Sequence, residues 1–164
     1  MLNRNSILKT LLYFLLLAIL QLSLVPFLSV KDAVPDLILI FLVYQTLLNG
    51  QIYGTVAGCL MGLFFDLFSG GLVGGYMFSK TLTGFVVGYI YNENKLEVYT
   101  EQYWFVFIVL LAGVLDSFIH GVILPTEVNM NFITLFFNTG LLPGLYTAAI
   151  ATPFLLFKKR KGLT

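Results

Sequence analysis

The sequence predicts an all-α protein: a single polytopic membrane bundle of about six helices over residues 1–164. Of the 164 residues, 59% are hydrophobic and only 10% are charged, too few charges to cover a water-soluble surface. The hydrophobic residues fall into long runs, several of which reach the roughly 20 residues that a helix needs to cross the hydrocarbon core. No linker or internal repeat divides the chain, so we expect one domain.

Six helices follow from the lengths of the apolar runs. The first run is too long for a signal-peptide core and is followed by no cleavage site, so we interpret it as a retained anchor. Segment 36–68 is too long for one straight crossing, and the turn signal Asn49-Gly50 divides it. Because its first half is short for a span, 36–68 is alternatively a re-entrant hairpin, which leaves four true spans. The expected spans are 7–28, 35–48, 52–68, 72–91, 103–124 and 132–157.

Basic residues predict the orientation of the bundle. Arg4 and Lys9 precede the first span, and the run KKRK at 158–161 follows the last. Cytoplasmic loops and ends carry an excess of lysine and arginine, so both termini are expected in the cytoplasm and the number of crossings is even. The 92–102 loop contains Lys95 and falls inside in this scheme, whereas 125–131 contains no basic residue and falls outside.

Glycine recurs at every fourth residue of the 52–68 helix, at Gly54, Gly58 and Gly62. Positions four apart share one helix face, so these glycines form a smooth groove into which another helix can pack closely. Gly84 and Gly88 form a second pair of this kind in the 72–91 helix. The grooves either hold the protein's own helices together or receive the helix of a partner.

Four polar residues interrupt the apolar spans: Asp66, Lys80, Asp116 and His120. At 1.5 Å per residue, the three charged ones all lie roughly 16–21 Å from the inner boundary. An unpaired charge is costly at that depth, so we expect Lys80 to be buried between Asp66 and Asp116, with His120 one turn from Asp116. Such a cluster is a structural clamp between helices, a contact for a ligand or partner, or a path for ions.

Several function classes find no support in the sequence. Nine Lys and Arg residues against eight Asp and Glu residues leave no basic surface for nucleic acid. Asp116 and His120 have helical ligand spacing, but the chain has one histidine and one cysteine, too few for a metal site. No catalytic motif is present, so we expect no enzyme, cofactor or metal. Pro35 suits the first helical position, and Asp36 beside it suits the helix dipole and is explained by capping and solvation.

Residues 34–90 closely resemble the signature region of the MreD family, rod shape-determining membrane proteins of bacteria. The resemblance depends on the order and spacing of several weak motifs. These are the Pro35-Asp36 start, the ladder Gly50, Gly54, Gly58 and Gly62, the Gly-Leu-x-x-Asp run ending at Asp66, then Ser69-Gly70, Gly74, Gly84 and Gly88-Tyr89.

The resemblance implies a scaffold of the cell-elongation machinery in the bacterial cytoplasmic membrane. Its implied direct partner is MreC, a single-span protein, and it implies a link between MreB filaments and peptidoglycan synthesis by RodA and a penicillin-binding protein. The family has no catalytic residues to transfer, so Pro35, Asp36, the glycines and Asp66 are expected to determine packing or partner binding. The family is also similar in fold to the substrate-binding subunits of energy-coupling-factor importers, which makes a vitamin-import subunit the alternative. An ion or proton carrier is a third possibility.

Overall fold

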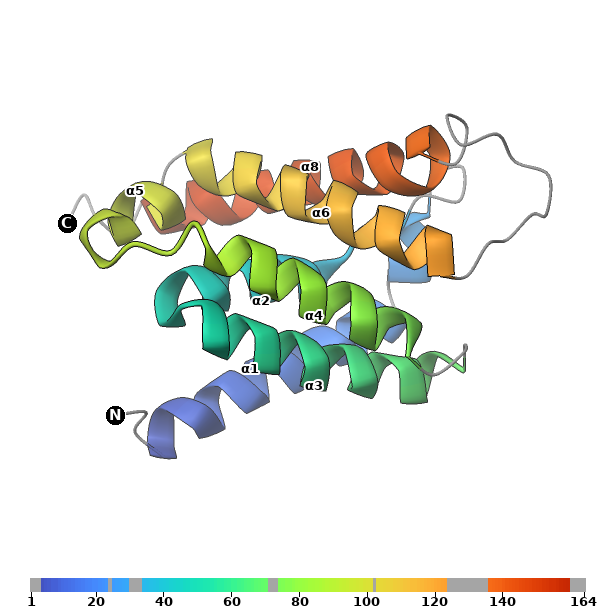
Figure 1. Ribbon diagram of the computed structural model, residues 1–164, viewed down its shortest axis with the longest axis horizontal. Coiled ribbons are helices and arrows are strands. Elements are labelled where there is room, and N and C mark those ends of the chain that lie inside the picture. Colours follow the sequence, from blue (N-terminus) through green and yellow to red (C-terminus); the bar gives the residue numbers. More distant parts are fainter. Residues whose placement is uncertain are drawn as a thin grey trace.

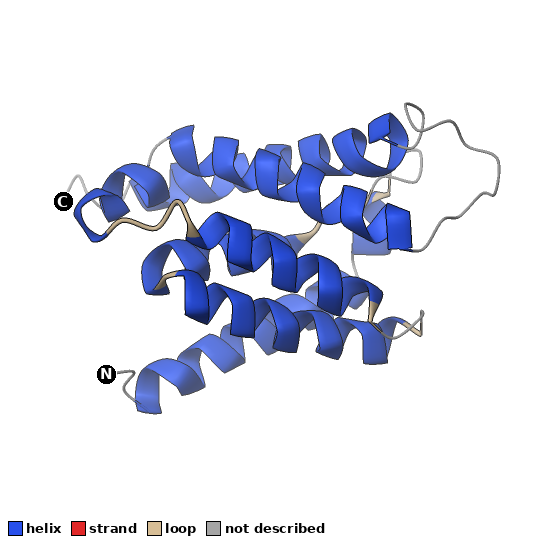
Figure 2. Ribbon diagram, in the orientation of Figure 1, coloured by secondary structure: helices blue, strands red, loops and turns tan. Residues whose placement is uncertain are grey.

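The computed structural model describes residues 4–23, 25–29, 34–70, 74–101, 103–123 and 136–159, and its regular structure in these ranges is entirely helical (Figure 2). The expected all-α class is therefore confirmed. The shorter elements are η1 (Val25–Leu28), η2 (Glu93–Lys95), α5 (Leu96–Glu101) and the π-helical turn η3 (Phe136–Leu141). The longer helices are α1 (Arg4–Ser23), α2 (Leu37–Asn49), α3 (Gln51–Ser69), α4 (Gly75–Gly88), α6 (Tyr103–Ile123) and α8 (Leu142–Lys159).

Two helix pairs form the two sides of the bundle. Helices α3 and α4 run antiparallel and share the most extensive interface, and α6 packs along α8 (Figure 1). Helix α4 also packs on α6 and thereby joins the two pairs. Helix α1 begins at the same end of the bundle at which α8 ends, and α5 lies at that end too.

The short helix α2 occupies the centre of the bundle. One side of α2 packs on α6 in a core that includes Leu39, Val43, Phe105 and Val109. Another side packs on α1 and α3 in a second cluster: Ile38, Leu42, Phe14, Ala18 and Met61. Helix α2 therefore contacts each of the other long helices.

The break between α2 and α3 consists of a single residue, Gly50. Its φ of 90° lies in a region that side chains disfavour, and its N–H donates to the carbonyl of Thr46 at 2.8 Å. The Asn49-Gly50 turn predicted from the sequence is thus confirmed. Helix α2 is left with 13 residues, or about 20 Å, which is shorter than the hydrocarbon core.

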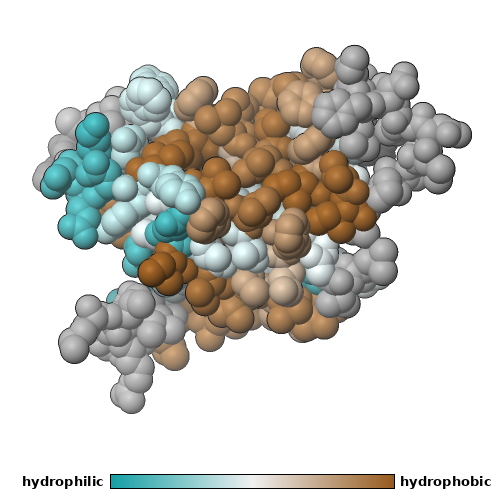
Figure 3. All heavy atoms as spheres, viewed as in Figure 1, coloured by the Kyte–Doolittle hydropathy of each residue, from teal (hydrophilic) through white to brown (hydrophobic). Residues whose placement is uncertain are grey.

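The described surface suits a membrane. Two helices, Gln51–Ser69 and Tyr103–Ile123, are long and apolar enough to cross one, and Leu8–Ser23 and Leu37–Asn49 are shorter apolar helices. In Figure 3 hydrophobic residues cover the middle of the visible face, while hydrophilic residues gather at the end where α5 lies. The number of crossings stays a prediction. The connection 125–131 and residues 132–135 of the last expected span lie outside the described residues.

Candidate functional site

The expected glycine groove of α3 contains α4 of the same chain. A Cβ atom added at Gly58 would lie 2.7 Å from the carbonyl carbon of Lys80, and one added at Gly62 would lie 2.6 Å from the Cα of Met77. Real side chains do not approach a backbone so closely, so α3 and α4 touch backbone to backbone. A partner helix would have to dock on another surface.

The remaining three predicted glycines extend the same contact. A Cβ at Gly84 would lie 2.7 Å from the carbonyl carbon of Gly54, so these two glycines face each other across the interface. Gly88 faces Gln51, where α3 begins. Gly54 also faces α2, because a Cβ there would lie 2.5 Å from Thr46 Oγ1. The glycines of α3 therefore allow close packing against both α2 and α4.

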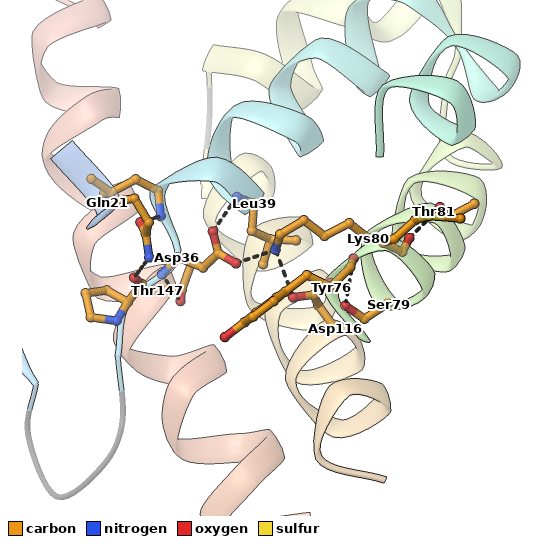
Figure 4. A network of polar contacts seen from close by, with 12 residues as sticks. Gln21, Asp36, Leu39, Tyr76, Ser79, Lys80, Thr81, Asp116 and Thr147 are labelled. Atoms are coloured by element: carbon orange, nitrogen blue, oxygen red, sulfur yellow. Dashed lines mark hydrogen bonds and ion pairs between the residues drawn. The ribbon is translucent and has the colours of Figure 1, made fainter. Parts of the chain in front are cut away.

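Lys80 is the centre of a buried polar cluster between α2, α4 and α6 (Figure 4). Its side chain is 1% exposed, and its ammonium forms ion pairs with Asp36 and, at 3.2 Å, with Oδ2 of Asp116. The ammonium also lies 5.6 Å from the ring centroid of Tyr76, within range of a cation–π contact. The predicted pairing of Lys80 with Asp116 is thus confirmed.

The predicted pairing of Lys80 with Asp66 is wrong. Asp66 is buried near the end of α3, and its carboxylate accepts the N–H groups of Gly74, Tyr76 and Met77 at 2.9, 3.0 and 2.9 Å. The first N–H groups of a helix have no partner within that helix, and a negative charge is favoured at this end. Asp66 therefore caps the helix that follows its own.

Asp36, and not Asp66, is the second ion-pair partner of Lys80. Its Oδ1 accepts the N–H of Leu39 at 2.8 Å and so caps α2, while its Oδ2 pairs with Lys80. Its own backbone N–H donates to Thr147 Oγ1 of α8 at 3.0 Å. The sequence-based expectation that capping and solvation explain Asp36 is therefore incomplete, because Asp36 also pairs with Lys80 and bonds to α8. Pro35 is buried and precedes the cap, so it does not occupy the first helical position.

Gln21 of α1 completes this arrangement. Its side-chain Nε2 donates to the carbonyl of Pro35 at 2.9 Å, and its Oε1 accepts the N–H of Leu37 at 2.8 Å. Pro35 is buried and Asp36 is partly buried, and irregular backbone at such a position is tolerated only if protein groups satisfy it. We call this set the polar junction: Gln21, Asp36, Lys80, Asp116 and Thr147.

Sequence reasoning missed Gln21 and Thr147. Both are buried polar side chains within apolar helices, with exposed fractions of 6% and 2%. A polar residue in a membrane-embedded run is expected to find a hydrogen-bond partner, just as a charge is. That rule, applied to uncharged residues, would have identified both.

His120 lies next to the polar junction without belonging to it. Its ring stacks on Tyr76 with centroids 4.0 Å apart and planes inclined by 26°. Since the N–H of Tyr76 donates to Asp66, this stack connects α6 to the cap of α4. The four predicted polar residues therefore lie in one region, but Tyr76, and not Lys80, connects Asp66 and His120 to it.

The chemistry of this region is that of a clamp. Asp66 and Asp36 satisfy helix N-termini, and Lys80 links Asp36 to Asp116, so the junction fixes how α1, α2, α4, α6 and α8 meet. Among the described residues, no three His, Cys, Asp or Glu side chains converge as they would around a metal ion.

A family model described as rod shape-determining protein MreD matches residues 3–161, nearly the whole chain. No curated protein and no solved structure matches this chain. The similarity to energy-coupling-factor subunits thus stays a prediction. The matched family consists of membrane proteins that act in rod-shape determination and is not known as a family of enzymes. Because the match covers nearly the whole chain, this chain belongs to the MreD family.

Proposed function

We propose that this protein is a non-catalytic scaffold of the bacterial cell-elongation machinery that binds MreC directly. Through MreC it helps to couple MreB filaments to peptidoglycan synthesis by RodA and a penicillin-binding protein. The observation that carries this proposal is the polar junction, whose charged groups are committed to ion pairs and helix caps. A rigid helical body with a fixed outer surface is what a scaffold requires.

The proposed orientation places both termini in the cytoplasm and all six long helices across the membrane. Its support is the common end at which α1 begins and α8 ends, together with the basic residues at both ends of the sequence. The hydrophilic end around α5 would then face the cytoplasm.

The proposed docking surface for MreC is the exposed face of α1 with the adjoining face of α3. Leu8, Leu11 and Leu12 of α1 are exposed by 69%, 53% and 68%, because the first half of α1 diverges from the bundle (Figure 1). On α3, Ile52, Val56 and Leu60 form an exposed stripe at helical spacing. The Phe14–Phe64 contact, with centroids 5.2 Å apart, closes the angle between the two helices. A single apolar helix would gain contacts with both of them there.

Site-specific photo-crosslinking in native membranes tests this surface. A photoreactive residue at Leu12 or Val56 should capture MreC. The same residue at Leu111, which is 51% exposed on α6, is the matched control and should capture lipid only. Capture of MreC at Leu111 but at neither Leu12 nor Val56 would move the docking surface to the other side. Co-purification with an ATPase module in place of MreC would favour the vitamin-import alternative.

A further inference from the structure

Two buried polar atoms of α6 have no hydrogen-bond partner among the described residues: Asp116 Oδ1 and His120 Nε2. A third such atom, Thr83 Oγ1, belongs to a hydroxyl that can rotate toward a carbonyl of its own helix. A carboxylate oxygen or an imidazole nitrogen has no such local alternative. Leaving either without a partner is costly, so each requires an explanation.

The two atoms lie on the same side of α6. Asp116 and His120 are four residues apart, which places them one above the other on the helix surface. Helical side chains lean toward the N-terminus, so the ring of His120 extends over the turn that carries Asp116. The two atoms form no direct hydrogen bond, and one small group between them would satisfy both.

We propose that one ordered water molecule bridges His120 Nε2 and Asp116 Oδ1. The ring donates its Nε2 proton to the water oxygen, and the water donates one of its protons to the carboxylate. Buried waters usually have about three polar partners. Ser79, whose hydroxyl donates to the carbonyl of Tyr76 at 3.3 Å and lies within hydrogen-bonding reach of Asp116, would accept the second proton of the water. In this arrangement His120 is the neutral tautomer with its proton on Nε2, which leaves the second proton of the water for Ser79.

The surroundings of His120 favour this neutral form. On α4, Lys80 already places an ammonium in the same region, and Tyr76 covers one face of the ring. The charge of Asp36 is paired with Lys80 at the N-terminus of α2, and that of Asp66 on α3 is taken up by three N–H groups. These two carboxylates are therefore already engaged by other donors.

The bridge would connect α6 to its neighbours at two positions, Asp116 and His120. Asp116 would be held by Lys80 through Oδ2 and by the water through Oδ1, while His120 would be held by the water and by the Tyr76 stack. This inference does not depend on MreC, since it concerns only the inside of the bundle.

Because the chain contains a single histidine, nitrogen NMR tests the bridge without ambiguity. In full-length protein labelled with ¹⁵N-histidine in lipid bilayers at pH 7, Nε2 should carry the proton and Nδ1 should not. The Nε2 proton should also receive magnetisation from water. A proton on Nδ1 alone, protons on both nitrogens, or an Nε2 proton without transfer from water would each overturn the proposal.

Two further variants separate the bridge from general packing. Asp116→Asn should shift the tautomer ratio toward Nδ1–H about fivefold, the size expected for one lost buried hydrogen bond. An unchanged ratio in folded Asp116→Asn protein would refute the link to Asp116. His120→Gln places a donor near the position of Nε2, whereas His120→Asn places one near Nδ1. His120→Gln should therefore melt at the higher temperature, and the reverse order would count against the bridge.

Discussion

The α3–α4 interface and the polar junction hold the same bundle together by opposite means. Between α3 and α4, glycines remove side chains, so that Gly58 and Gly84 bring the two backbones into contact. At the start of α2, the side chains of Gln21, Asp36 and Thr147 satisfy the backbone, and Lys80 links the Asp36 carboxylate to Asp116. The first region depends on shape and the second on hydrogen-bonding chemistry.

This difference predicts which substitutions each region tolerates. Lipid offers no hydrophobic gain for helix association, so close packing and buried polar contacts must supply the stability. The glycine contact should reject any added volume but be insensitive to charge. The polar junction should tolerate changes of similar volume only where donors and acceptors are kept.

The largest expected effect is that of Gly58→Leu. The new side chain would collide with the backbone of Lys80, which cannot move without separating the two helices. Overpacking of a side chain alone typically costs about 1–3 kcal/mol. Because two backbones must separate here, we expect no folded protein, measured as the absence of a cooperative melting transition in mild detergent. Val56→Leu, two residues earlier on the exposed face of α3, is the matched control and should be nearly neutral. Equal stability of both variants would contradict the backbone contact.

Lys80→Met should cost about 3–5 kcal/mol, because it leaves the carboxylates of Asp36 and Asp116 without their cation. Adding Asp116→Asn should restore part of this loss in the double mutant, measured by the same melting experiment. Adding Asp66→Asn should not, because Asp66 caps α4 and does not pair with Lys80. Rescue by Asp66→Asn alone would show that the charges are paired as the sequence first indicated.

Asp66→Ala should cost about 1–3 kcal/mol, since three N–H groups at the start of α4 lose their acceptor. Asp66→Asn keeps one acceptor oxygen and should cost less. Hydrogen exchange of the amides of Tyr76 and Met77 is the direct measurement. Exchange that is no faster in Asp66→Ala than in the unaltered protein would argue against the cap.

The smallest expected effect is that of Thr147→Val, which preserves shape but removes the acceptor for the Asp36 N–H. The expected loss is about 1 kcal/mol, the net value of one such hydrogen bond. Thr152→Val, whose hydroxyl bonds only to the carbonyl of Ala148 in its own helix, is the control and should have less effect. A larger loss in the control would mean that the bond between helices adds little.

The sequence predicted the helices better than the contacts between them. Apolar runs and the Asn49-Gly50 signal are local, so they indicated the helical class and the break at Gly50 correctly. Depth counting also identified Lys80 and Asp116 as neighbours, because both lie well inside long helices. The predicted pairing of Asp66 with Lys80 was wrong, because the Asp66 carboxylate accepts backbone N–H groups at the start of α4. The depth of a residue in the membrane does not show that a neighbouring helix needs an N-terminal cap.

Asp36 was misplaced for a related reason. A helix start is normally assigned to the membrane surface, whereas the N-terminus of α2 lies inside the bundle, beside Lys80 and Thr147. The short length of α2 was visible in the sequence. The residues that contact its N-terminus could not be predicted, because they depend on tertiary packing. Gln21 and Thr147 could be recognised only as isolated polar residues, with no indication of what they would bind.

The hydrogen bond between Asp36 and Thr147 joins residues 111 positions apart in the sequence. During translation, the start of α2 therefore leaves the ribosome long before one of its partners has been synthesised. Until α8 is in place, the amide of Asp36, at the N-cap of α2, lacks that acceptor. The backbone at the start of α2 therefore has all its partners only after the last helix has joined the bundle.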